Sequence, residues 1–280
     1  RTLAAGEAEA ARQRVLTRKI LEVRSTDGWL ALVAQDLRHF NGVHTSACLG
    51  RLVRLRGAQG GRLRRSSPLA ALLQQLCEFA RGGRLGAREL SNVMEASAHL
   101  QSEHDAFPPL LRTCAAALAS SASVANAQDL ATGAWALAKC GDPCLPVLQV
   151  IAQESLTKLA TFRPRELAKM AWAFATLGAQ DRALFRGLAR EMTSKSAESL
   201  PQDLANVAWA FAAVAAWEPT LGSALAEGAL ARRGDLLPQD LANLMWAFAK
   251  AAGPDARLSA ALEERALAKL KAFRPQELAA

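Results

Sequence analysis

The residues best suited to chemistry are polar side chains at three fixed places in a repeated segment. Counted from a leucine that returns every 37 residues, they lie two residues before it, two after it and nine after it. They are amides, hydroxyls, imidazoles or cations, and they differ between copies. Side chains that vary over a constant framework are what base readout by helical repeats requires. The predicted RNA-contacting set, called the polar stripe, comprises Arg88, Asn92, His99, Gln128, Thr132, Lys139, Arg165, Lys169, Thr176, Gln202, Asn206, Gln239, Asn243, Lys250 and Gln276.

The alternative interpretation of this stripe is an ordinary solvated helix face. Such faces usually mix both charge signs, whereas these positions carry no acid. The pattern therefore favours a surface that contacts a ligand.

A second candidate is the basic segment in the first third of the chain. Residues 1–85 carry 15 Lys/Arg and 6 Asp/Glu, whereas residues 86–280 carry 19 and 20. No acid lies between Asp36 and Glu78. This asymmetry indicates a polyanionic partner, with nucleic acid the first candidate, although a solvated loop is the alternative. The predicted phosphate-contacting patch comprises Arg51, Arg54, Arg56, Arg62, Arg64 and Arg65.

Catalytic and metal-binding patterns are weak by comparison. The histidines His39, His44, His99 and His104 form two i,i+5 pairs, which is not the i,i+4 spacing of a helical zinc site. The glycine-rich residues 57–62 lack the Lys-Ser/Thr of a phosphate-binding loop. We therefore expect no enzymatic activity, no metal and no cofactor. An odd number of scattered cysteines also argues against a disulfide framework.

The elements that position these residues are repeated helix pairs. The key leucines are Leu130, Leu167, Leu204, Leu241 and Leu278. A proline precedes an acid by two residues in four copies, which predicts a helix start with a carboxylate in its first turn. Glycines 141, 178 and 253 mark turns after these helices. Two helices in 37 residues leave only short connections, as in stacked helical hairpins.

Four tryptophans keep the same step: Trp135, Trp172, Trp209 and Trp246. At 100° per residue, Trp209 lies about 140° from Leu204, outside the apolar face. We expect these tryptophans to pack against the next repeat, and the alternative is that they stack on nucleobases.

The predicted fold class is therefore all-α, an α-solenoid of about six to seven helical hairpins with a 37-residue period. We expect an N-terminal helical extension over residues 1–28 and a divergent basic first repeat with a Gly/Arg-rich linker over 29–86. Regular repeats follow over 87–280, the last of them incomplete. No apolar run of about 18 residues predicts a membrane span.

Residues 201–212 and 238–249 share the pattern P-Q-D-L-A-N-x-x-W-A-F-A, which resembles octotricopeptide repeats. These helical-hairpin repeats are often found upstream of RAP domains and are related to FAST-kinase-like repeats. Residues 41–53 resemble the divergent opening unit of such arrays. Three features depart from the pattern: Glu95 replaces the tryptophan, residues 56–68 form a long basic insertion, and no RAP domain is present.

The resemblance implies an RNA-binding α-solenoid of a mitochondrion or plastid. Its expected partners are a single-stranded transcript or ribosomal RNA, together with other proteins of a large complex. Two interpretations stay open at this point. The chain acts on transcripts as a sequence-reading RNA binder, or it is a structural scaffold subunit of an organellar ribonucleoprotein such as a ribosome.

Overall fold

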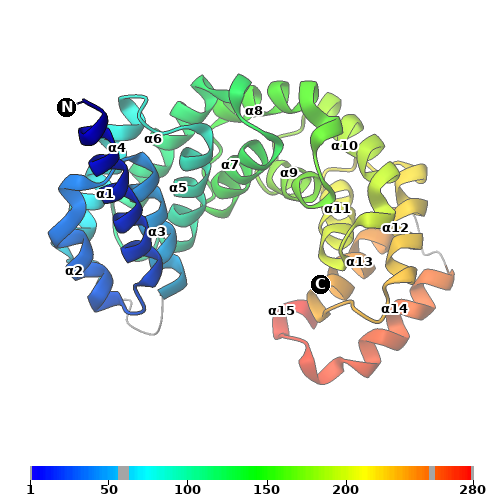
Figure 1. Cartoon of the computed structure of the whole chain (residues 1–280). Coiled ribbons are helices and arrows are strands. Elements are labelled where there is room, and N and C mark those ends of the chain that lie inside the picture. The colour runs from blue at the N-terminus through cyan, green and yellow to red at the C-terminus, as the bar shows by residue number, and fades with distance from the viewer. Residues whose placement is uncertain (1, 56–62, 252–255, 279–280) are drawn as a thin grey trace. The chain divides into compact units, whose positions relative to one another are not determined.

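The computed structural model describes residues 2–55, 63–251 and 256–278, with side chains for 10–55, 63–251, 257–275 and 277. Within these ranges the chain folds into helices joined by turns, and no strand occurs there (Figure 1). The prediction of an all-helical fold is confirmed.

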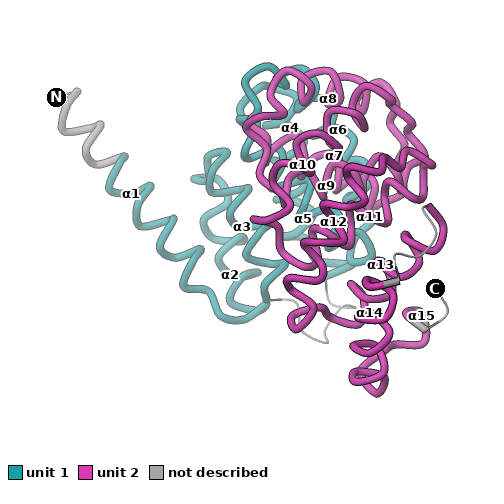
Figure 2. Tube along the Cα trace, turned by 90° about the vertical axis from the view of Figure 1, so that its right-hand side faces the viewer, with its two compact units in different colours: residues 1–125 teal, residues 126–280 magenta. Residues whose placement is uncertain are grey.

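The chain divides into two compact units, residues 1–125 and residues 126–280 (Figure 2). The predicted boundary between residues 86 and 87 lies within unit 1. Each unit is described separately below.

Unit 1 has two rows of packed helices. In the first row α1 packs on α3 and α3 on α5, and in the second row α2 packs on α4 and α4 on α6. The short 3₁₀ helix η1 (Leu37–His39) precedes α3. The helices are α1 (Thr2–Glu22), α2 (Thr26–Asp36), α3 (Gly42–Leu55), α4 (Ser67–Arg81), α5 (Ala87–Leu100) and α6 (Phe107–Ser120).

Unit 2 also has two rows. In the first row α7 packs on α9, α9 on α11 and α11 on α13, whereas α10 packs on both α8 and α12 in the second row. Figure 1 shows α8, α10 and α12 along one side of the first row. The first row comprises α7 (Ala127–Lys139), α9 (Pro164–Thr176), α11 (Pro201–Ala213), α13 (Pro238–Ala251) and the short α15 (Pro275–Leu278). The second row comprises α8 (Leu145–Lys158), α10 (Arg182–Lys195), α12 (Pro219–Ala231) and α14 (Ala256–Ala268).

The helices α9, α11, α13 and α15 begin with the predicted first-turn carboxylate. Its oxygen accepts the backbone N–H three residues earlier, which satisfies one donor that the helix itself leaves without a partner. In α11 the Leu200 N–H donates to Asp203 at 3.2 Å, and in α13 the Leu237 N–H donates to Asp240 at 2.9 Å. The proline at the start costs nothing, because its missing N–H is not needed there.

The helix ends explain the recurring glycines. Gly141 and Gly178 both have φ of +64°, the left-handed conformation that lets a helix terminate tightly. After α11 the equivalent residue is Ala215, which adopts φ of +55° despite its Cβ atom. Gly253 lies outside the described residues.

The core of unit 2 contains the key leucines and the aromatic residues seven positions later. Leu130, Leu167, Leu204 and Leu241 are fully buried. Phe211 packs edge-on against Phe185 of α10, with ring centroids 5.1 Å apart. The apolar face predicted around Leu204 therefore joins the two rows and leaves the opposite face of the first-row helices accessible.

Candidate nucleic-acid interface

The polar stripe follows the accessible face of the first-row helices. The residues two positions before the key leucine are exposed: Gln128, Arg165, Gln202 and Gln239. Those nine positions after it are exposed as well: Lys139, Thr176 and Lys250. Three residues two positions after it are half-buried: Lys169, Asn206 and Asn243. In unit 1 Arg88, Asn92 and His99 are exposed, and the side chain of Gln276 lies outside the described residues.

Thr132 differs from the other members of the stripe because it is buried. Its hydroxyl accepts a hydrogen bond from Lys169 Nζ of the next first-row helix at 3.3 Å. The same ammonium lies 5.4 Å from the ring centroid of Trp135. Thr132 therefore positions Lys169 and does not itself present a surface to a ligand.

The carboxylates of the same helices are withdrawn from solvent. Asp129, Glu166, Asp203 and Asp240 are only 3–7% exposed. They are the only acids in α7, α9, α11 and α13, four helices that the structure describes completely. Burial is the main cause that raises the pKa of Asp203 and Asp240, and the hydrogen bonds from Leu200 and Leu237 oppose it. The accessible faces of these four helices consequently carry amides, hydroxyls and cations without any carboxylate.

The four repeated tryptophans lie beside the polar stripe and are half-buried. The rings of Trp209 and Trp246 stack with centroids 6.3 Å apart and planes inclined by 30°. Lys250 places its ammonium 4.6 Å from the centroid of Trp246, a cation–π contact. The stacking of Trp209 on Trp246 agrees with the expected packing of a tryptophan against the next repeat, while part of each ring stays accessible.

The second-row helices of unit 2 have a different charge pattern. Lys195 donates to the carbonyls of Ala160 and Phe162 at 3.0 and 2.8 Å, and it also pairs with Glu191 at 2.9 Å. Lys269, in the turn that follows α14, likewise donates to the Leu236 carbonyl at 2.6 Å. These cations hold the turns between helices, and exposed acids occur on α12 and α14, namely Glu227, Glu263 and Glu264. The first row is therefore the better candidate for a polyanionic ligand.

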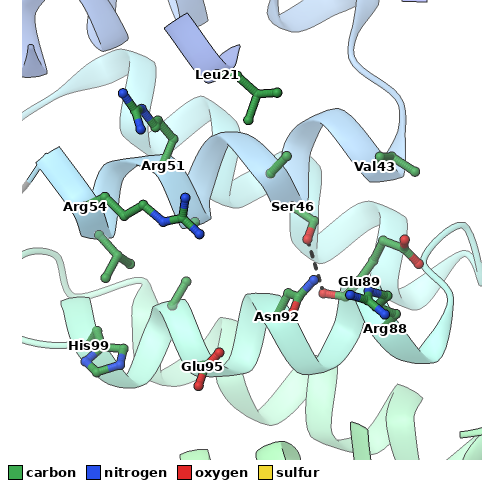
Figure 3. A pocket seen from close by; sticks show the side chains of 14 residues that line it. Leu21, Val43, Ser46, Arg51, Arg54, Arg88, Glu89, Asn92, Glu95 and His99 are labelled. Carbon is green, nitrogen blue, oxygen red and sulfur yellow. Dashed lines mark hydrogen bonds between the residues drawn. The ribbon is translucent and has the colours of Figure 1, made fainter. Parts of the chain in front are cut away.

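Unit 1 contains a groove of about 550 Å³ between α3 and α5 (Figure 3). It brings together residues from both predicted sets: Arg51 and Arg54 of the basic segment, and Arg88, Asn92 and His99 of the polar stripe. Small residues of α3 and α5 also line it, namely Ser46, Ala47, Gly50 and Ala96. Its two carboxylates belong to Glu89 and Glu95.

The predicted arginine patch is only partly a single surface. Arg51 uses its guanidinium to bond the Val23 carbonyl at 2.5–2.8 Å, next to the end of α1. Arg54 is exposed at the groove, whereas Arg64 lies 3.5 Å from the Ser102 carbonyl. Arg65 is exposed, and Arg56 and Arg62 lie outside the described residues.

Sequence reasoning missed the role of His44. Its Nδ1 accepts the Asn41 N–H at 3.5 Å, while the Asn41 side chain accepts the His44 N–H at 3.0 Å. Burial is the main cause that lowers the pKa of His44, which favours the neutral ring that this arrangement needs. His44 thus does in α3 what the first-turn carboxylates do in α5, α7, α9, α11 and α13. His44 lies three residues after the cap position Asn41, just as Asp203 lies three residues after Leu200. The same count along the sequence would have identified His44.

Among the described residues, no cluster of three or more His, Cys, Asp or Glu side chains is arranged to hold a metal ion. All five cysteines have free thiols, and burial raises the pKa of Cys48 to about 12. In the part of the chain that the structure describes, no helix has the length and apolar character needed to cross a bilayer.

A comparison with models of known protein families finds no match, and a comparison with curated proteins finds none either. The functional argument therefore rests on the residues and their geometry.

Proposed function

We propose that this chain is an RNA-binding α-solenoid in which stacked helical hairpins present the first-row helices to single-stranded RNA. The starts of α7, α9, α11, α13 and α15 support a regular array, because each lies 37 residues after the last. The resemblance to octotricopeptide repeats supports RNA as the ligand. It also supports a mitochondrial or plastid location and a role in transcript stability, processing or translation.

The observation that carries the proposal is the burial of every carboxylate of α7, α9, α11 and α13, which leaves none on the accessible faces of these four helices. Amides and cations remain there beside half-buried tryptophan rings, the combination that binds single-stranded nucleic acid through phosphates and base faces. Accessible acids would repel a phosphate backbone, so their burial in all four helices favours a polyanion. Binding, and not catalysis, is the activity that this surface supports.

The test compares two sets of three cations in unit 2. In the first variant Lys139, Arg165 and Lys250 of the first row become glutamine, and in the control Arg182, Arg186 and Arg190 of α10 become glutamine. All six are exposed, so both variants lose the same formal charge. Affinity for a fluorescent single-stranded RNA is measured over a range of salt concentrations.

The first-row variant should flatten the log–log salt dependence by about 2, since each lost phosphate contact contributes roughly 0.7. The α10 variant should keep the wild-type slope. Equal slopes in both variants would overturn the assignment of the first row. No RNA binding by the purified chain would instead favour a scaffold subunit held in a large ribonucleoprotein by protein contacts.

A further inference from the structure

The groove of unit 1 is lined by the residues at the helix positions where unit 2 carries tryptophan. In α7, α9, α11 and α13 the tryptophan is the ninth residue after the N-terminal cap position, as in Leu200 to Trp209. The same count from Gly86 reaches Glu95 in α5. From Asn41, whose side chain caps α3, it reaches Gly50. At the position of the repeated tryptophan, α3 and α5 therefore carry Gly50 and Glu95, which have no ring. Both residues line the groove.

The groove also has space for a planar ligand. A Cβ atom built on Gly50 would meet no other atom within 4 Å, so the α3 side is open at this point. Ala47 and Ala96 add only methyl groups to the lining. The volume of about 550 Å³ lies within the range of small-molecule sites, roughly 300–1,000 Å³.

Several polar groups that line the groove make contacts within the protein. Glu89 accepts the Gly86 N–H at 3.1 Å, and Arg51 holds the Val23 carbonyl. Ser46 donates to the Glu89 carbonyl at 3.5 Å, the contact drawn in Figure 3. Figure 3 shows Glu95 midway along α5, with Asn92 and Arg88 on one side of it and His99 on the other, and Arg54 on α3 across the groove. The groove thus brings a carboxylate and an amide together with the guanidinium groups of Arg54 and Arg88.

We propose that this groove holds one unstacked guanine base of the bound RNA, with Glu95 as the acceptor that selects it. Guanine alone among the four bases presents two adjacent donors, N1–H and the N2 amine, which one carboxylate accepts together. Adenine, cytosine and uracil each place an acceptor beside their single donor group and would direct it at the carboxylate. Asn92 supplies a further hydrogen-bonding group beside Glu95, and Arg54 and Arg88 contact the flanking phosphates. This inference rests on the proposed RNA-binding function.

The experiment measures affinity for 12-nucleotide single-stranded RNAs that differ at one central base. The strands are uridine throughout, or carry a central guanine, inosine or adenine. Inosine lacks the N2 amine and so removes one of the two donors. The variants are Glu95→Gln, which keeps the shape but loses one acceptor, and Glu95→Trp, which restores the residue of the other first-row helices. Glu78→Gln is the matched control, because Glu78 is exposed on α4 of the same unit and lies outside the groove lining.

The wild type should bind the guanine strand about tenfold or more tightly than the uridine strand, with inosine in between. Glu95→Gln and Glu95→Trp should both abolish this ratio, and Glu78→Gln should preserve it. The ratio is the readout, because losing a negative charge strengthens binding to every strand. Circular dichroism checks that each variant is folded.

Equal affinity of the wild type for all four strands would overturn the guanine site and leave the proposed RNA binding intact. Retention of the guanine preference by Glu95→Gln would also overturn the role of Glu95. No binding to any strand would overturn the guanine site and count against the proposed function together.

Discussion

The pairs α3/α5 and α11/α13 share a helix register, and the position of the repeated tryptophan is occupied differently in each pair. Gly50 and Glu95 line an open groove in the first pair, whereas Trp209 and Trp246 stack on each other in the second. The surrounding helices begin in the same way, since His44 and Glu89 cap the first pair as Asp203 and Asp240 cap the second. The comparison teaches that glycine and glutamate stand at the tryptophan position where a groove is open, and tryptophan where two rings stack.

The largest expected effect separates the packed pair from the open one. Trp209→Ala should lower the free energy of unfolding by about 3 kcal/mol, the low end for a tryptophan because the ring is half-buried. Glu95→Ala should change it by less than about 1 kcal/mol, since no ring packs there. Urea unfolding followed by circular dichroism measures both. Equal losses would mean that Glu95 is as much a packing residue as Trp209, and the comparison would fail.

The next prediction compares two glycines of α3 to test whether the groove is open at Gly50. Gly50→Ala should raise the free energy of unfolding by about 0.5–1 kcal/mol, because alanine favours a helix and its Cβ meets nothing within 4 Å. Gly42→Ala should lower it by about 2 kcal/mol, because its Cβ would lie 2.6 Å from the Arg84 carbonyl oxygen. The same unfolding measurement applies to both variants. A loss at Gly50 would show that the groove is closed at this point.

Much of this comparison could be predicted from the sequence, because local rules control it. The proline and acid at each helix start, the buried leucines and the terminating glycines follow from helix capping and periodicity. The register of Trp209 and Trp246 needs no more than counting. Glu95 was visible as a departure from the repeated pattern, although its environment was not.

The groove itself could not be predicted, because it depends on which residues of α3 meet α5. The 37-residue step does not hold between Asn41 and Gly86, since an insertion lies between the two helices. Burial of Thr132 was missed for a similar reason. Its contact with Lys169 joins two helices, and a helical wheel drawn for one helix gives no information on its neighbour.

The two pairs should also respond to pH in opposite directions. The pKa of His44 is lowered from its ordinary value of 6.5, so the unfolded chain binds the proton first and stability is lost as the pH falls below 6.5. The pKa of Asp203 is raised from 3.8, so the folded chain binds the proton first and stability is gained as the pH falls toward 3.8.

Two neutral variants isolate these contributions. The advantage of the wild type over His44→Gln should shrink between pH 7 and 5, by about 1 kcal/mol at most, the size of one hydrogen bond. Relative to Asp203→Asn, the wild type should instead gain stability toward pH 4. Urea unfolding at each pH gives both differences. Parallel trends for the two variants would mean that the caps of α3 and α11 are electrostatically equivalent.

The smallest effect concerns the ends of two neighbouring first-row helices. The fifteenth residue after the cap position is Gly178 following α9 and Ala215 following α11, and both have positive φ. A Cβ atom is unfavourable in this conformation, so Ala215→Gly should raise the free energy of unfolding by about 0.5–1 kcal/mol. The converse change Gly178→Ala should lower it by a similar amount, because its Cβ meets no other atom within 4 Å and only the backbone conformation is at stake. Thermal unfolding of both variants measures the two shifts. A destabilised Ala215→Gly would mean that contacts of the Ala215 methyl group outweigh the backbone term, and that the end of α11 does not follow the rule that governs α9.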